Sequence, residues 1–349
     1  MKLQERVITM LLLVLCSAIL KAQEKPTPKV HGYCFGDYFG KLEGDTSEIS
    51  PSQYSQVPKD FNGFQFRRIY LYVEHTLSDN FFSQFLLEGN DKAFEPGGKH
   101  GVFVKTAYLE WKNAIPRSSA LFGLVPTPTW SLLSEKVWNY RSIEKTIIDF
   151  RGFGSASDMG VLLRGRFDSA GTVNYTIMVG NGNGQKPENN KYKKYYGGIF
   201  VKPTKEFVVE AYADFQPAAQ DRNVMTLKGF AAYQSSKFTV GVEAFQQTQN
   251  KADSAGNDKK PLGVSVFAWV PIPNVQNLNG FARFDFFDPD TEVDSVGFKE
   301  MFFAAGVDFM PISNVHFMPN VWVNSFSAKE SGDKDADIVA RLTVFYTYK

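Results

Sequence analysis

Strict alternation of apolar and polar side chains is the feature that most limits what this chain can fold into. In the last segment every even position from Ala336 to Tyr348 is apolar, whereas Asp337, Arg341 and Thr343 lie between them. Alternation with a period of two places the two sets on opposite faces of a β-strand. The run is long enough to cross a bilayer as a tilted strand, which needs about 9–11 residues. The chain is therefore predicted to end in a strand with one apolar face.

Charged residues lie in the middle of a similar segment near residue 283. Arg283 and Asp285 share one face, and Ala282, Phe284 and Phe286 share the other. In a soluble sandwich the charged face would meet solvent, whereas in an outer-membrane barrel it would face a water-filled interior. This pattern alone permits both arrangements. In the barrel the charges must point inward, because an arginine at the lipid midplane costs about 2–4 kcal/mol.

Segments of this kind recur along the whole chain. Sixteen are expected, at about 30–39, 62–74, 79–90, 101–111, 119–125, 158–167, 172–180, 195–202, 206–215, 225–234, 237–247, 262–270, 278–287, 299–309, 314–326 and 336–348. A closed barrel lets every backbone N–H and C=O of such strands find a partner within the protein, as hydrocarbon surroundings require.

The connections between these segments alternate in length. Short ones, such as 76–78 and 203–205, alternate with long polar ones, such as 40–61 and 181–194. Outer-membrane barrels have short periplasmic turns and long extracellular loops, whereas a sandwich has no reason to separate them. The sequence thus predicts an all-β fold, a transmembrane antiparallel β-barrel of about 16 strands. A soluble secreted β-sandwich that binds a ligand is the alternative.

The N-terminus predicts export. Lys2 and Arg6 precede an apolar run over 7–20, which is typical of a signal peptide. The run is shorter than the roughly 20 residues of a membrane-spanning helix, which makes a retained anchor the weaker alternative. We expect a signal peptide over 1–22 and a single outer-membrane barrel domain over 23–349.

Composition excludes several classes of function. The formal net charge is only +1, whereas proteins that bind nucleic acid are usually basic. The four histidines lie singly, without the spacing of metal ligands, and no Gly-x-Ser-x-Gly motif occurs. Without its leader the chain keeps one cysteine, Cys34, so no disulfide framework is expected. We expect no nucleic acid partner, metal, cofactor, catalytic residue or enzymatic activity.

Several motifs in the first half resemble one known family. They are FQFRRIYLYVEHTLSDNFFSQFLLEGND at 64–91, VKTAYLEW at 104–111, LFGLVPTP at 121–128, SDMGVLLRGRF at 157–167 and YTIMVGNGNG at 175–184. In this order they resemble the phosphate-selective porin O and P family. The resemblance implies a homotrimeric, sixteen-stranded porin in lipid of the bacterial outer membrane, which admits small hydrophilic solutes by passive diffusion.

The charge pattern departs from that family. Its namesakes have strongly basic lumens, whereas the polar faces of this chain carry acidic residues as well as arginines. Anions such as phosphate remain one class of solute, with a mild preference at most. A non-conducting structural or adhesion barrel is a further alternative. The residues expected to line the solute path are Arg68, Arg164, Arg166, Arg283, Arg341, Asp285, Glu210 and Glu243.

Two pairs of arginines carry more specific expectations. Arg67 and Arg68 are successive, so only one should face the lumen, and the apolar positions that follow favour Arg68. Arg164 and Arg166 share a face and could hold an anion between them. The alternative is that they pair with acidic neighbours such as Asp158.

Segment 126–157 is too long for an ordinary connection. A barrel of sixteen strands leaves an aqueous channel, which this segment would narrow if it folded inward. Lys136, Arg141, Lys145 and Arg151 would then meet the permeating solute. The alternative is an external loop whose charges are simply solvated.

Overall fold

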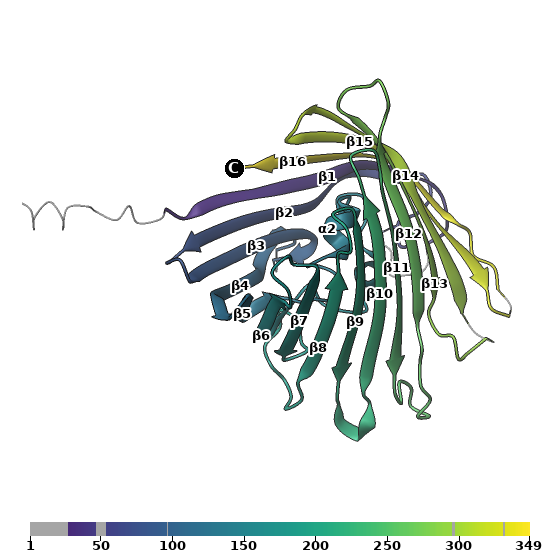
Figure 1. The fold of residues 1–349 in the computed structure, drawn as a ribbon. Helices are drawn as coiled ribbons and strands as arrows, with labels where there is room; N and C mark the ends of the chain where they lie inside the picture. Colours follow the sequence, from purple (N-terminus) through teal and green to yellow (C-terminus); the bar gives the residue numbers. More distant parts are fainter. Residues whose placement is uncertain (1–26, 47–53, 96, 295–296, 331) are drawn as a thin grey trace, which may run out of the picture.

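One closed antiparallel sheet forms the protein (Figure 1). The computed structural model describes residues 27–46, 54–95, 97–294, 297–330 and 332–349, so the predicted leader over 1–22 lies outside the described residues. Each strand pairs with its neighbours in sequence, and β1 pairs with β16 to close the barrel. This confirms the predicted fold. The alternative of two packed sheets is wrong, because a single sheet closes on itself.

The strands lie close to their predicted positions, and β1, β3 and β4 run a few residues further than expected. Along the chain they are β1 (Lys29–Glu43), β2 (Asn62–Thr76), β3 (Phe81–Phe94), β4 (His100–Ile115), β5 (Ser118–Pro126), β6 (Ser157–Arg166), β7 (Val173–Gly180), β8 (Lys194–Val201), β9 (Phe207–Gln216), β10 (Val224–Gln234), β11 (Thr239–Gln249), β12 (Leu262–Pro271), β13 (Leu278–Asp288), β14 (Phe298–Ile312), β15 (Val315–Ala328) and β16 (Asp337–Tyr348).

Connections of different length gather at opposite ends of the barrel, as predicted. The start of β1 and the end of β16 lie at one end, called here the turn end, together with short turns such as 116–117 and 313–314. Long connections such as 127–156 and 250–261 leave from the other end, called the loop end. Within the described residues, no helix has the length and apolar character needed to cross a membrane.

The two faces of the strands are as the alternation predicts. In β13, Phe284 is 46% exposed on the outer surface, whereas Arg283 and Asp285 point inward and are almost fully buried. Exposed apolar side chains cover the outside of many strands, including Val209, Leu227, Val240, Val242, Val266, Met301, Phe303 and Leu342.

A β-bulge changes the facing of residues in β2. The pairing of β1 with β2 skips Arg67, so this residue is an extra one in its strand. As a result Arg67 and Arg68 both point inward, where Arg67 lies 3.3 Å from Asp37 and Arg68 lies 2.5 Å from Glu88. The prediction that only one of the two arginines could face the lumen is wrong. Strict alternation holds only while the register is unbroken.

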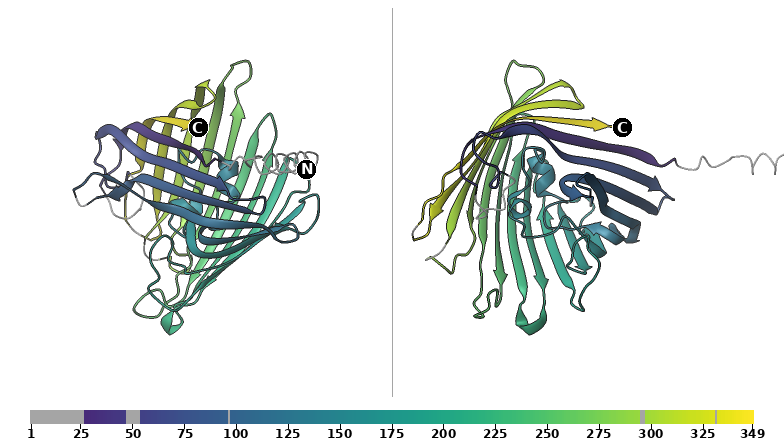
Figure 2. Two further views of the ribbon diagram at one scale, coloured as in Figure 1. Left: turned by 90° about the vertical axis from the view of Figure 1, so that its left-hand side faces the viewer. Right: turned by 180° about the vertical axis from the view of Figure 1, so that it is seen from behind.

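Segment 127–156, called here the plug, lies inside the ring of strands (Figures 1 and 2). It contains two short helices, α2 (Ser134–Trp138) and α3 (Ile147–Phe150). Its apolar side chains pack against aromatic residues on the inner face of the barrel wall. The buried cluster includes Trp138, Tyr140, Ile143 and Phe150 of the plug with Phe230, Phe267, Phe281, Phe302 and Trp322 of the wall.

This cluster corrects one expectation about the lumen. A water-filled interior was expected on the polar face of every strand, but much of the inner face from β10 to β15 is apolar and in contact with the plug. Burial of aromatic surface is worth about 25 cal/mol per Å², which holds the plug against this wall. Any solute path must therefore pass elsewhere.

Candidate solute path and its charged residues

Arginines of the barrel wall fix the backbone of the plug. Arg67, Arg283 and Arg341 come from β2, β13 and β16, and each donates to a carbonyl group within residues 142–145. The bond is 2.7 Å for Arg67 and 3.1 Å for Arg341. All three side chains are at most 5% exposed. The plug therefore covers Arg283 and Arg341, two of the residues predicted to line the solute path.

The predicted acidic path residues are buried as well. Asp285 forms a bidentate pair with Arg283, and Glu210 accepts a 2.6 Å bond from Lys228. Neither carboxylate oxygen of Glu243 has a hydrogen-bond partner within the described residues. These three acids, which were predicted to line the solute path, are no more than 5% exposed.

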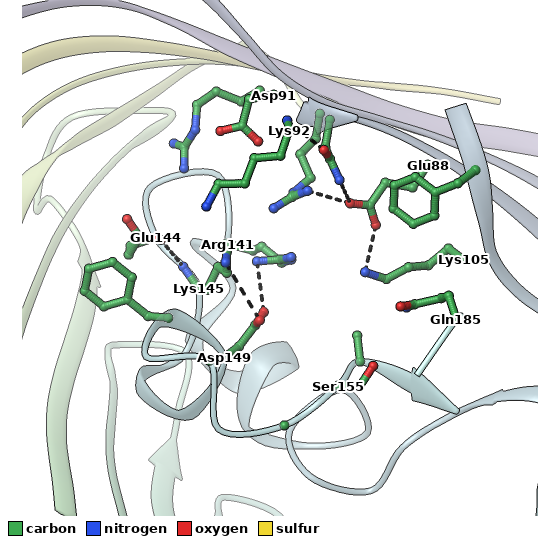
Figure 3. Close-up of a pocket in the computed structure, with 18 of the residues that line it drawn as sticks. Glu88, Asp91, Lys92, Lys105, Arg141, Glu144, Lys145, Asp149, Ser155 and Gln185 are labelled. Carbon is green, nitrogen blue, oxygen red and sulfur yellow. Dashed lines mark hydrogen bonds and ion pairs between the residues drawn. The ribbon is translucent and has the colours of Figure 1, made fainter. Parts of the chain in front are cut away.

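A charged cavity lies between the plug and the wall formed by β2, β3 and β4. This loop-end cavity has a volume of about 350 Å³ (Figure 3). It has seven basic and four acidic lining residues, an excess of three positive charges among the lining residues. Three of the basic residues, Arg67, Arg141 and Arg151, pair with acids outside this lining. The basic residues are Arg67, Arg68, Lys92, Lys105, Arg141, Lys145 and Arg151, and the acidic residues are Glu88, Asp91, Glu144 and Asp149.

Two lysines of this cavity are the least neutralised. The ammonium group of Lys92 has no hydrogen bond or ion pair within the described residues, and that of Lys145 lies 3.9 Å from Asp149. By contrast, Glu88 pairs with both Arg68 and Lys105. Figure 3 shows Lys92 and Lys105 directed from the wall toward the plug. The excess charge is thus concentrated at Lys92 and Lys145.

Burial and neighbouring charges tune the acids and bases of the plug. Burial lowers the pKa of Lys145, although Asp149 opposes the shift. Burial alone would raise the pKa of Glu144, but Arg67 and other nearby cations outweigh it and the pKa is lowered. Glu144 therefore stays ionised and adds its charge to this side of the plug.

Arg141 lines the loop-end cavity and also a second cavity. Its Nε atom is 3.1 Å from a carboxylate oxygen of Glu135, and its Nη1 atom is 3.5 Å from Asp149. Burial raises the pKa of Glu135, while Arg141 opposes the shift. Arg141 therefore contributes to the lining of both cavities.

The second cavity opens toward the other end of the barrel and is called the turn-end cavity. It has a volume of about 370 Å³. Its polar lining comprises Glu135, Lys136, Asn139, Arg141, Ser142, Asp308, His316 and Thr347, and its apolar lining comprises Tyr33, Phe35, Tyr140, Met318 and Phe345.

Arg164 and Arg166 line a third cavity, also near the turn end. It has a volume of about 380 Å³, and Lys136 and Arg117 line it with them, without any acidic side chain among its lining residues. Lys136 also lines the turn-end cavity. The structure therefore brings Arg164, Arg166 and one predicted plug residue together.

The partner of Arg164 differs from the expected one. Its Nη2 atom lies 3.0 Å from both carboxylate oxygens of Glu110. Asp158 instead accepts a 2.8 Å bond from the hydroxyl group of Tyr196. Arg164 thus pairs with an acidic neighbour, as the alternative supposed, but that neighbour is Glu110 and not Asp158, which lies at the loop-end start of β6.

The four charged plug residues singled out from the sequence all lie inside the barrel. All four line cavities, and Arg151 in addition pairs with Glu300 at 2.5 Å and is 5% exposed. Arg151 therefore acts mainly in fixing the plug.

Sequence reasoning missed Lys92 and Lys105. Lys105 was missed because it lies at a second bulge, where the pairing of β3 with β4 skips this residue. Strict alternation would have put it on the lipid side. Lys92 lies in segment 91–100, which the sequence predicts to be a loop. A predicted strand two residues longer than 79–90 would have included it.

Comparisons with known proteins agree with this architecture. No protein-family model matches the sequence, and no match was found among curated proteins. Similar solved structures include the outer membrane channel DcaP of Acinetobacter baumannii, with a TM-score of 0.65 and 11% identity over 94% of this chain and 99% of that one.

Two further solved structures resemble the chain. The anion-selective porin from Comamonas acidovorans has a TM-score of 0.61 and 11% identity over 92% of this chain and 99% of that one. The in-vitro folded, trimeric form of OmpT of Vibrio cholerae has a TM-score of 0.59 and 12% identity over 93% and 100%. At such low identities the likeness concerns the fold. Among the described residues, no three His, Cys, Asp or Glu side chains are placed to hold a metal ion.

Proposed function

We propose that this protein is a porin of the bacterial outer membrane, a passive diffusion channel for small hydrophilic solutes that prefers anions. The observation that carries the proposal is a loop-end cavity and a turn-end cavity inside a closed barrel that share Arg141 as a lining residue. The apolar outer surface suits insertion into lipid. Similar folds in an outer membrane channel and an anion-selective porin support it further.

The preference for anions follows from charge counts in the cavities. The loop-end cavity has an excess of three positive charges, and the third cavity has cationic side chains alone among its charged lining residues. Rings of charged side chains are a common means of ion selection in pores. Phosphate is one candidate among small anions, in keeping with the resemblance to the porin O and P family.

Export and assembly complete the proposal. The segment over 1–22 serves as a signal peptide, and residues 23–349 form the single barrel domain. The barrel assembles as a homotrimer, as the trimeric structure with a similar fold suggests. Chemical cross-linking of the protein in outer-membrane preparations should give a trimer. Recovery of the monomer alone would reject the homotrimer.

Single-channel recording tests the central claim. The mature protein is refolded, its closed barrel is verified by heat-modifiable migration in detergent gels, and it is added to a planar bilayer with a potassium chloride gradient. We expect stable conductance steps and a reversal potential displaced toward that of chloride. A verified barrel without conductance would reject the channel and favour a structural or adhesion barrel. A reversal potential displaced toward potassium would reject the anion preference.

A further inference from the structure

The turn-end cavity has aromatic walls that remain partly accessible. Tyr33 of β1 and Phe345 of β16 are half-buried, and their ring centroids are 5.5 Å apart. Phe35 and Tyr140 also line the cavity but are almost fully buried. Phe345 is fixed from a third side by His316, whose ring meets it edge-on at 5.1 Å. A flat or cyclic group can therefore lie against Tyr33 and Phe345, whose positions are set by packing.

All but one of the charged side chains that line this cavity have a hydrogen-bond or ion-pair partner. Arg141 pairs with Glu135 at 3.1 Å, and His316 pairs with Asp308 at 2.9 Å. The exposed residue Lys136 also lines the cavity, and its ammonium group has no hydrogen bond or ion pair within the described residues. The cavity thus offers one unpaired cation next to two aromatic rings.

We infer that the turn-end cavity is a binding site for a small organic anion that combines a ring with a single carboxylate. The ring lies against Tyr33 and Phe345, and the carboxylate accepts hydrogen bonds from Lys136. The cavity volume of about 370 Å³ falls in the lower part of the range of small-molecule sites, about 300–1,000 Å³. An inorganic anion would leave the rings uncovered, and a neutral ring would leave Lys136 without a partner.

This site deepens the proposed function, on which it rests for the route by which the solute arrives. The loop-end cavity, with its excess of positive charge, draws anions toward Arg141. The turn-end cavity adds aromatic side chains to its charged ones. A solute with both an acid and a ring contacts Lys136 and the aromatic rings of this cavity, whereas acetate or phosphate contacts Lys136 and leaves the rings uncovered.

Equilibrium binding measured apart from conductance tests the inference. Sodium benzoate is titrated into the refolded full-length barrel in detergent by calorimetry, with sodium acetate and benzyl alcohol as comparison probes. Benzoate should bind about tenfold more tightly than either probe, because each lacks one of the two contacts. Acetate that binds as tightly as benzoate would overturn the inference, since the aromatic wall would then contribute nothing.

Variants locate the site. Lys136→Gln should weaken benzoate binding by about tenfold, the loss expected when a charge-assisted hydrogen bond becomes a neutral one. Phe345→Leu should weaken it by about threefold, because an apolar contact remains but the aromatic pair is lost. Lys237→Gln, which removes an exposed lysine on the turn between β10 and β11, is the matched control and should change nothing. Unchanged affinity in Lys136→Gln would overturn the inference.

The two proposals fail in distinguishable ways. A folded barrel that binds benzoate but gives no conductance would reject the channel and keep the site. A barrel that conducts ions but does not discriminate benzoate from acetate would keep the channel and reject the site. Phe345 also packs against other side chains, so each variant is first checked for heat-modifiable migration. If Phe345→Leu does not fold, Lys136→Gln, at an exposed position, tests the binding site alone.

Discussion

Reversal of charge at Lys92 and Lys145 should reverse the ion selectivity of the channel. These two ammonium groups are the least neutralised in the loop-end cavity. Replacing both with glutamate turns an excess of three positive charges into an excess of one negative charge. The barrel should still fold, because neither ammonium group forms a close bond to the wall or plug.

The size of the effect follows from Coulomb's law. A unit charge about 4 Å from a permeating ion contributes about 1 kcal/mol in bulk water and about 4 kcal/mol at an effective dielectric constant of 20. Each Lys→Glu substitution moves the charge by two units, so the local chloride concentration should fall by more than about tenfold. Potassium should gain by a similar factor. The reversal potential in a potassium chloride gradient should therefore change sign.

Bilayer recording of the Lys92→Glu, Lys145→Glu double variant measures this directly. The matched control is Lys205→Glu with Lys237→Glu, which reverses two exposed lysines on turns outside the cavity. The control should keep the chloride preference. An unchanged reversal potential in the cavity variant would refute the reasoning, since ions would then bypass this cavity. The effect should shrink at high salt, where the Debye length falls to about 3 Å.

Three further predictions concern titration and packing. Anion preference should rise on acidification, because Glu135, whose pKa is raised by burial, becomes neutral and leaves Arg141 with Asp149 as its remaining acidic partner. The preference should fall at alkaline pH as Lys145, whose pKa is lowered, loses its charge. Reversal potentials measured across pH test this, and Glu135→Gln should abolish the change on acidification. Trp322→Ala should lower the free energy of unfolding by about 3–5 kcal/mol, because a fully buried ring is lost. Urea titrations of the protein in vesicles measure this, and an unchanged midpoint would mean that the plug is not held against Trp322. Glu243→Gln should raise that free energy by roughly 1–3 kcal/mol, since a buried carboxylate without a hydrogen-bond partner is removed, and a loss of stability would contradict this account.

Local rules were sufficient for the strands and their faces. In β13 and β16 the period of two correctly placed Phe284 and Leu342 outside and Arg283 and Arg341 inside. Loop lengths correctly separated the two ends of the barrel. These features depend on residues close in sequence, and the cost of charge in lipid is the same in every strand.

The sequence did not predict the contacts between segments that are distant in the chain. Arg283, Arg341 and Asp285 face inward as predicted, but contacts with the plug bury them. The sequence could indicate that segment 126–157 was too long for an ordinary loop, but it could not specify which wall would receive it. That choice depends on inward aromatic rings such as Phe302, which a pattern of single strands does not distinguish from lumen residues.

The sequence by itself determined a barrel of sixteen strands, its apolar exterior and the orientation of its ends, because side-chain alternation and loop length are local properties. Only the tertiary structure decided which cations line the path. Arg67 and Lys105 enter the interior through bulges, which arise from the registers of neighbouring strands. Arg141 lies between two cavities because the plug folds inward and packs against an apolar wall. Register and packing join residues far apart in sequence, so no single segment encodes them.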